Sequence, residues 1–422
     1  MPGTGTPQGA SRLTIHMNVS FNSELIRLTE YTSRLRSRIA SRAHRGHGPV
    51  FVEGIDRFCG PVSPRRRALL SLLPSAWQRA AEQYPDVRVF NIDGLTIEVV
   101  RALNRMGYVV DIVDYTVAGF CPSRAYNLYM GHGGHTRTIL DQLSASTFVL
   151  HYASGAYWAA FNQMSQERYD NFRTRKGLTG ERGFVRSLDG TESGEEYLAR
   201  RADATFLSGP RTAATFDRIC KRMCLLYLGA YVDESFVPQD RDFEEGRQHF
   251  IYVAGTSGNI QKGLDLLLEV FARMPSVHLY VHCKVDGELL RAYRSELARP
   301  NIHYTYHYEW GPLRRHLRQL LRRANFTITA PIDSGPGTAF IGSMALGLVP
   351  VGYADIEGDE SDSVLTDSYS IDALVEAVQR ASSRSAEWCR EASRKTSARY
   401  QRLHAPSVFG EKFGQMLANL GL

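Results

Sequence analysis

The sequence predicts an α/β protein with two domains of parallel sheet. Short apolar runs, each the size of a buried strand, alternate with segments of helical periodicity in both halves of the chain. At 422 residues the chain is too long for one hydrophobic core, and 43% hydrophobic residues can fill two. The polar segment 237–248 shows no apolar periodicity, so we expect it to link the domains.

The N-terminal half contains a strand-helix-strand unit. We expect a strand at 87–91, a turn at Asp93 and Gly94, a helix over 98–106, and a second strand at 108–113. Further apolar runs predict strands at 126–130, 147–151, 204–207 and 224–227.

The segment before this unit, 12–85, reads as helical with arginine-rich turns, and its role is not evident. The first eleven residues are small and polar, which predicts a tail without a signal sequence.

A first glycine-rich loop lies at 255–263. It follows the apolar run 250–254 and precedes a leucine-rich helical pattern at 264–271. Its glycines let the backbone come close to a ligand, and Lys262 adds a positive charge. The spacing differs from that of a Walker loop, so this loop alone is a weak signal.

A second glycine-rich loop, 333–338, joins an expected strand at 326–329 to a helix that Gly347 ends. The free N–H groups and the positive dipole end of that helix point toward the loop. In an α/β sheet this arrangement usually binds a phosphate. An ordinary strand-loop-helix turn is the alternative for this segment taken alone.

Together the two loops resemble the C-terminal domain of retaining GT-B glycosyltransferases (glycosyltransferase group 1, family 4-like), which include glycogen synthase-like and lipopolysaccharide-building enzymes. In that family Lys-Gly precedes a leucine-rich helix, as at 262–271. The family's Glu-Gly-x-Gly phrase matches 334–337, and its Glu-Ala-Met-Ala-x-Gly-x-Pro-Val phrase matches 344–351 from the methionine onward.

The resemblance implies a GT-B architecture of two Rossmann-like domains facing a cleft, with a C-terminal helix crossing back to the N-terminal domain. We therefore expect three parts: an acceptor-side domain at 12–236, a nucleotide-sugar-binding domain at 249–400, and the crossing helix at 401–422, with 409–420 as its candidate core.

The chain departs from the family at the side chains that contact the donor. The two motif glutamates fall on Ser334 and Gly342; in the family the first contacts the donor sugar and the second the nucleotide ribose. Asp333 lies one residue before the first position and could substitute for it. The family's arginine, five residues before the lysine, falls on Ser257.

The resemblance implies a nucleotide-diphosphate sugar as donor substrate, with no metal and no other cofactor. The residues expected to bind it are Gly255, Ser257, Gly258, Ser334, Gly335, Pro336, Gly337 and Thr338. After the strand expected at 302–306, Tyr308 or Trp310 could stack on the base, although Trp310 could equally fill the core. We expect Lys262, His132 and Asp333 to be the catalytic residues.

On the acceptor side, ligand loops are expected where strands end. The candidates are Asp93, Gly94, His135, Ser154 and Gly155. Retaining GT-B enzymes often carry an N-domain histidine near the donor sugar, and His132 and His135 qualify by position; a structural turn histidine is the alternative. No third ligand accompanies them, so we expect no metal. An inverting enzyme would instead need a base, with Asp93, His132 or Glu98 as candidates.

Charge and cysteine content bound the location. The net charge is +6, and the arginines form clusters at 34–45, 65–67 and 314–323 that could attract an anionic membrane surface or simply be solvated helix faces. No motif for nucleic acid is present. No apolar run of transmembrane length occurs, and the six scattered cysteines fit reduced thiols. We expect a cytoplasmic protein, with peripheral contact at the inner face of the membrane left open.

The expected function is therefore a glycosyltransferase that moves a sugar from a nucleotide-diphosphate sugar to an acceptor hydroxyl with retention, in glycan or glycoconjugate biosynthesis. The acceptor could be a glycan, a lipid-linked glycan or a small molecule. One alternative is a non-catalytic GT-B partner or sugar-binding subunit that has lost the donor-contacting glutamates. Another is a different GT-B chemistry, such as an epimerase or an inverting transferase.

Overall fold

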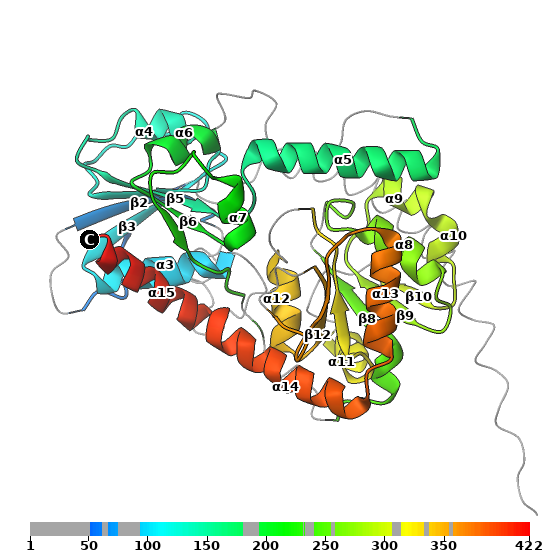
Figure 1. Ribbon diagram of the computed structural model, residues 1–422. Helices are drawn as coiled ribbons and strands as arrows, with labels where there is room; N and C mark the ends of the chain where they lie inside the picture. Colours follow the sequence, from blue (N-terminus) through cyan, green and yellow to red (C-terminus); the bar gives the residue numbers. More distant parts are fainter. Residues whose placement is uncertain are drawn as a thin grey trace, which may run out of the picture.

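The computed structural model describes the following residues: 51–60, 66–74, 93–179, 194–230, 232, 240–254, 258–305, 314–332, 337–353 and 358–422, with the backbone alone at 93, 94, 305, 314–318 and 353. The chain forms two lobes, each built around one sheet (Figure 1). No helix among these residues is long and apolar enough to cross a membrane.

The first sheet has seven strands within the described residues, in the spatial order β1-β3-β2-β4-β5-β6-β7. All neighbours are parallel except β1 and β3. The strands are β1 (Phe51–Ile55), β2 (Arg66–Leu72), β3 (Tyr108–Asp114), β4 (Leu128–Gly131), β5 (Phe148–Ala153), β6 (Ala204–Leu207) and β7 (Met223–Leu225).

The strand β2 corrects the expectation that 12–85 is helical. It lies between β3 and β4 in the sheet and pairs with both. Its two initial arginines are engaged by β3: the guanidinium of Arg66 lies 4.3 Å from the Tyr108 ring centroid, and Arg67 lies 3.6 Å from the Asp111 carboxylate. The strand expected at 87–91 lies outside the described residues.

The helices of the first half are α3 (Asp93–Arg105), α4 (Thr136–Leu140), α5 (Trp158–Lys176), α6 (Gly194–Arg201) and α7 (Pro210–Thr215). In α3 the apolar residues Leu95, Val99 and Leu103 recur every four positions and are all buried. Gly107, with φ +82°, ends this segment before β3.

The second sheet has six parallel strands within the described residues, in the order β10-β9-β8-β11-β12-β13. The strands are β8 (His249–Val253), β9 (His278–His282), β10 (Ile302–Thr305), β11 (Phe326–Ile328), β12 (Val349–Tyr353) and β13 (Val364–Thr366). The helices are η3 (Glu245–Gln248), α8 (Leu264–Ala272), α9 (Gly287–Ala292), α10 (Arg294–Leu297), α11 (Arg314–Arg323), α12 (Gly337–Ala345), α13 (Ile371–Ser382), α14 (Ala386–Leu403) and α15 (Pro406–Asn419).

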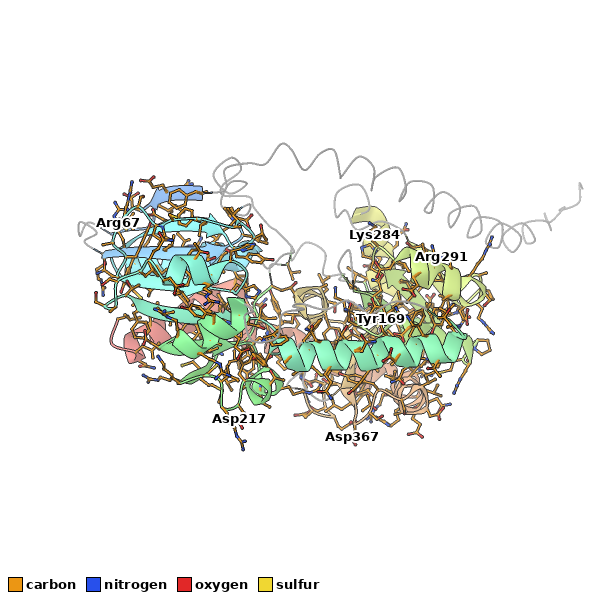
Figure 2. The ribbon with its side chains drawn as sticks, turned by 90° about the horizontal axis from the view of Figure 1, so that it is seen from above. Arg67, Tyr169, Asp217, Lys284, Arg291 and Asp367 are labelled. Atoms are coloured by element: carbon orange, nitrogen blue, oxygen red, sulfur yellow. The ribbon has the colours of Figure 1, made fainter. Side chains whose placement is uncertain are left out.

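Two helical segments pass between the lobes in opposite directions (Figure 1). The C-terminal helix α15 follows α14 and packs against α3 of the first lobe, where Phe409, Phe413 and Leu417 join the core. This confirms the predicted helix that crosses back. Helix α5 comes from the first half of the chain but lies along the second lobe (Figure 2). Its residue Phe172 is buried in that lobe's core.

Candidate functional site

Each parallel sheet has a point at which the chain changes direction across it. In the second sheet the chain adds β9 and β10 on one side of β8 and then returns to place β11 on the other side. In the first sheet β3 and β4 flank β2 in the same way. Ligands of open α/β sheets bind outside the carboxyl ends of the strands at these points. The topology therefore selects the loops after β8 and β11, and those after β2 and β4.

The loops after β8 and β11 are locked together. The amide of Ala330 donates to the Lys262 carbonyl at 3.3 Å, and the amide of Ile332 donates to the Gln261 carbonyl at 2.8 Å. Gly263 has φ +83°, and a Cβ there would lie 2.4 Å from the Ala330 carbonyl oxygen. Glycine is thus required both for the backbone angle and for the close approach of the two loops.

Lys262 occupies the end of the first loop, immediately before Gly263 and α8. Its positive charge affects the pKa values of two nearby groups, Cys283 and Asp286. Burial raises the pKa of Cys283 and of Asp286, and the positive charge of Lys262 opposes both effects. Gly258, the first residue of the loop's described part (258–263), also has a positive φ of +73°.

The second loop leads into α12, whose first residue, Gly337, has φ +70°. Gly337 and Thr338 are half-buried at the N-terminus of this helix. Gly342, at the position of the second family glutamate, is buried inside α12. The other predicted donor residues lie outside the described residues: Gly255, Ser257, Tyr308, Trp310, Asp333, Ser334, Gly335 and Pro336.

Arg241 holds the opposite end of α12. Its guanidinium donates to the carbonyls of Leu346 at 2.7 Å and Gly347 at 2.6 Å, and its Nε donates to the Leu321 carbonyl at 2.9 Å. Burial lowers the pKa of Arg241 to about 10. A cation at a helix C-terminus complements the dipole. In the sequence Arg241 lies in the polar segment expected to link the domains, where no pattern marks it.

Arg168, on α5, forms hydrogen bonds to the backbone of the same two loops. Its Nη1 donates to the carbonyls of Ala330 at 3.2 Å and Ile260 at 3.5 Å, and it lies 3.8 Å from the Asp265 carboxylate. The side chain of Ser165, one turn earlier, accepts a hydrogen bond from Gln261 at 3.1 Å. No pattern along the chain marks this support, because Arg168 is 92 residues from Ile260 and 162 residues from Ala330 in the sequence.

In the first sheet the structure brings His132 and Ser154 together. They follow the paired strands β4 and β5, and His132 Nε2 lies 3.3 Å from Ser154 Oγ. His132 Nδ1 lies 2.7 Å from the Tyr152 carbonyl, which can only accept, so Nδ1 carries the proton and donates. In the neutral ring Nε2 is then the acceptor, facing the Ser154 hydroxyl.

The other predicted acceptor-side residues lie in different surroundings. His135 is exposed and precedes α4, and its side chain makes no capping hydrogen bond. Gly155 is buried beside Ser154. Asp93 and Gly94 begin α3, and the structure describes only their backbone.

The loops of the two lobes meet. Ala156, from the loop after β5, packs with Phe161 of α5 and with Ile332 of the loop after β11, and all three side chains are buried. Ala156 is two residues beyond Ser154, and Ile332 immediately precedes the second glycine-rich loop. The carboxyl edges of the two sheets therefore approach each other at this cluster. Among the described residues no group of three His, Cys, Asp or Glu could hold a metal ion.

Comparison with solved structures establishes the architecture. The chain is similar to Anabaena HepE, which was solved in complex with UDP and glucose: the TM-score is 0.51 with 11% identity, over 84% of this chain and 100% of that one. No protein-family model matches the chain, and no curated protein matches it significantly by sequence. At this identity the similarity establishes the fold alone: the chain has the GT-B architecture.

Weaker similarities include two further structures. Staphylococcus aureus TarM has a TM-score of 0.49 with 12% identity over 68% of this chain, and the chain spans only 54% of TarM. A trehalose-phosphate synthase from Burkholderia vietnamiensis has a TM-score of 0.45 with 13% identity, over 83% of this chain and 82% of that one. These scores are too low to carry an argument about this protein.

Proposed function

We propose that this protein is a glycosyltransferase that moves a sugar from a nucleotide-diphosphate sugar to an acceptor hydroxyl, with retention and without a metal. One observation carries the proposal: the loops after β5 and β11, from opposite lobes, pack together through Ala156 and Ile332. In this proposal the cluster holds the His132–Ser154 pair of one sheet opposite the Lys262 and α12 loops of the other. The UDP and glucose found in HepE belong to that protein, and they motivate the same class of donor here.

In this proposal the second lobe binds the donor. The diphosphate lies against the N-terminus of α12, with Lys262 as its cationic partner. As the bond between the anomeric carbon and the diphosphate oxygen breaks, negative charge grows on the leaving group, and these contacts strengthen. The acceptor oxygen bonds to the anomeric carbon on the same face, and its proton passes to the leaving phosphate. Such a contact typically contributes about 2–4 kcal/mol to the transition state.

A second function has one specific observation in its favour. The family glutamate that contacts the ribose is replaced by Gly342, which is buried in α12 and offers no carboxylate. A protein with this architecture could therefore bind a nucleotide sugar or a partner without catalysing transfer. The two functions differ in turnover, not in architecture.

Membrane contact is a subordinate part of the proposal. Of the arginine clusters, Arg66 and Arg67 are engaged within the first sheet, and Arg322 is paired with Asp240 at 3.0 Å. The structure describes no side chain at 34–45 or 314–318. A cytoplasmic protein that touches the inner face of a membrane would use those unassigned arginines.

The test is a thermal-shift screen against UDP, GDP, dTDP, ADP and CMP, with and without their sugars, on the wild type and Lys262→Ala. The matched control is Lys395→Ala, which changes an exposed lysine on α14, distant in sequence from Lys262. A nucleotide at 100 times its Kd stabilises the fold by about 2.7 kcal/mol. We expect a selective shift with one diphosphate that Lys262→Ala abolishes and Lys395→Ala retains.

Two other outcomes decide against parts of the proposal. An unchanged shift in Lys262→Ala would remove this lysine from the diphosphate site. No shift with any nucleotide would favour the non-catalytic function. A selective shift without turnover on any acceptor would do the same while leaving the donor site in place.

A further inference from the structure

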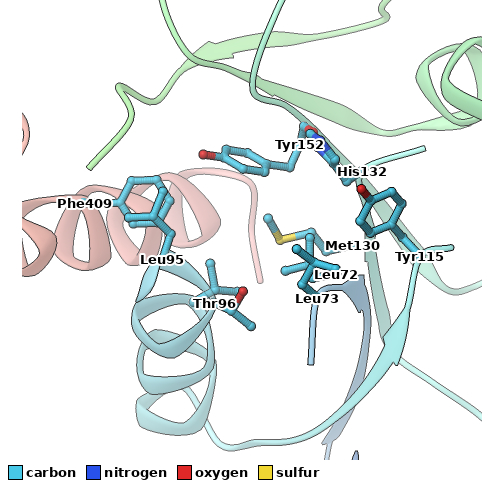
Figure 3. A pocket seen from close by; sticks show the side chains of 10 residues that line it. Leu72, Leu73, Leu95, Thr96, Tyr115, Met130, His132, Tyr152 and Phe409 are labelled. Carbon is cyan, nitrogen blue, oxygen red and sulfur yellow. The ribbon is translucent and has the colours of Figure 1, made fainter. Parts of the chain in front are cut away.

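A cavity of about 140 Å³ lies outside the carboxyl ends of β2 and β4, where the first sheet changes direction (Figure 3). Its apolar walls come from four places in the chain: the end of β2, strand β4, helix α3, and the crossing helix α15. The apolar residues are Leu72, Leu73, Leu95, Val99, Met130 and Phe409. Apart from Leu73, each is at most 9% exposed.

The polar side chains of the cavity are few and uncharged. Thr96, Tyr115 and Tyr152 contribute hydroxyl-bearing side chains, and His132 contributes its ring. Among the described residues that line the cavity there is no Asp, Glu, Lys or Arg. A site that holds a sugar by its hydroxyls, or a phosphorylated substrate, needs charged or amide groups to replace the lost hydration. This lining instead favours a neutral, apolar group.

The cavity borders the proposed site of transfer. Its wall includes His132, whose Nδ1–H donates to the Tyr152 carbonyl, so that the acceptor nitrogen Nε2 lies on the side of Ser154. Beyond Ser154, Ala156 shares a buried cluster with Phe161 and with Ile332 of the donor lobe. An apolar group held in the cavity would therefore carry an attached hydroxyl toward the His132 wall, on the side of Ser154 and the donor loops.

From this geometry we infer that the acceptor is a neutral alcohol whose hydroxyl is carried by an apolar group about the size of a benzene ring, and not a bare glycan. A dry cavity of about 150 Å³ is known to accept benzene, which sets the scale. An aromatic ring or a branched five-carbon alkenyl unit both have this chemistry. The inference rests on the proposed function for the meaning of the hydroxyl, and on the cavity alone for the apolar group.

The binding test uses ligand-observed NMR on the full chain without any nucleotide. The probes are benzyl alcohol and 3-methyl-2-buten-1-ol, which separate a soluble aromatic source from the end of an isoprenoid lipid, with methyl glucoside as the polar comparison. We expect one of the two apolar alcohols to bind at least tenfold more tightly than methyl glucoside. Tighter binding of methyl glucoside would overturn the inference.

Two variants tie that binding to the cavity. Val99→Phe fills the cavity from α3, and Leu73→Trp narrows it from its half-buried rim, which keeps a test available if the buried substitution fails to fold. Each folded variant should weaken binding of the alcohol at least tenfold. Unchanged binding in a folded variant would place the probe elsewhere and refute the assignment. Lys262→Ala should bind the alcohol as the wild type does.

Transfer assays then separate this inference from the proposed function. Using the nucleotide sugar identified by the thermal-shift screen, we expect product from the apolar alcohol that bound and little from methyl glucoside. Transfer to methyl glucoside alone would overturn the inference and leave the glycosyltransferase intact. If the alcohol bound in the cavity but no nucleotide bound, the glycosyltransferase function would be overturned and the apolar cavity site would remain.

Discussion

Gly263 shows how one residue couples the two loops of the proposed donor site. Its positive φ turns the chain from the Lys262 loop into α8, and its missing side chain leaves room for the Ala330 carbonyl of the loop after β11. The hydrogen bond from Ala330 N to Lys262 O depends on this approach. The family's Lys-Gly phrase therefore has a physical basis in this chain that does not depend on catalysis.

We expect Gly263→Ala to destabilise the protein more than Gly177→Ala. Both glycines have positive φ, so both substitutions incur backbone strain, of about 1 kcal/mol or somewhat more. At Gly177 a Cβ meets nothing within 4 Å, whereas at Gly263 it meets backbone atoms of Ala330. The difference in unfolding free energy, measured with urea, should be at least about 1–2 kcal/mol. Equal losses would show that the loops can separate without cost.

A second expectation at this scale concerns pH. His404 is buried, its Nδ1 donates to the Leu228 carbonyl at 2.8 Å, and burial lowers its pKa to about 4, helped by the nearby charges of Arg399 and Lys412. The unfolded histidine keeps a pKa near 6.5 and binds protons first as the pH falls. The associated stability is full above pH 6.5 and is lost as the pH drops toward 4, by up to about 3 kcal/mol.

The measurement compares unfolding free energies at pH 7.5 and pH 5 in the wild type and in His404→Asn. The variant should lose less stability between these pH values than the wild type does. His135→Asn, which changes an exposed histidine, serves as the control and should follow the wild type. A His404→Asn protein with the wild-type pH dependence would assign the acid sensitivity to other groups.

At the scale of elements, α5 is held to the second lobe by a cluster of charges. Asp265, fully buried at the start of α8, receives a 2.5 Å hydrogen bond from Arg175 and lies 3.8 Å from Arg168. Arg175 also reaches Glu269 at 2.9 Å. Removing one member of a buried ionic cluster leaves the others desolvated and unpaired, which is why such clusters are sensitive to substitution.

Asp265→Ala should therefore lower the unfolding free energy by about 3–5 kcal/mol. The matched comparison is Arg273→Ala, at the other end of α8, which breaks an ion pair with Asp372 whose side chains are 53% and 86% exposed. That pair should contribute less than about 1 kcal/mol. Chemical denaturation of both variants decides the point, and a loss at Asp265 no larger than that at Arg273 would contradict the assigned role of the cluster.

At the scale of elements, some features could be predicted from the sequence and others could not. The positions of strands such as β3 and β6 agree with the prediction, because their apolar runs carry the signal locally. Strand β2 was missed because it begins with Arg66 and Arg67, whose charged ends are satisfied by partners on β3. The role of α5 was missed because its buried face includes Ser165 and Arg168, so no apolar stripe marks it.

Likewise, some parts of the candidate site could be predicted from the sequence and others could not. Local motifs predicted the Lys262 loop and the start of α12, and the ends of strands predicted His132 and Ser154. The contacts that unite these pieces are long-range: Arg168, Arg241 and the packing of Ala156 on Ile332 all join distant segments. A local pattern of residues does not indicate which distant segments come into contact. The roles of the predicted residues stay predictions until nucleotide binding is measured.

At the scale of the whole molecule, the two lobes exchange helices. Phe172 of α5 stacks on Tyr293 in the second core, with ring centroids 6.0 Å apart. Phe413 of α15 contacts Phe206 edge-on in the first core, with centroids 5.4 Å apart. Each lobe thus contains a fully buried aromatic side chain supplied by a helix that the other lobe anchors, and neither core is complete without its neighbour.

This exchange leads us to expect that the lobes unfold as one cooperative unit, although two-domain proteins commonly unfold in steps. Phe172→Ala and Phe413→Ala should each cost about 3–5 kcal/mol, since both truncate a fully buried ring. Differential scanning calorimetry should show a single transition whose midpoint falls in both variants. Two resolved transitions, each displaced by only one substitution, would mean that the lobes are independent. A single transition would mean that a ligand bound to either lobe raises the unfolding midpoint of both.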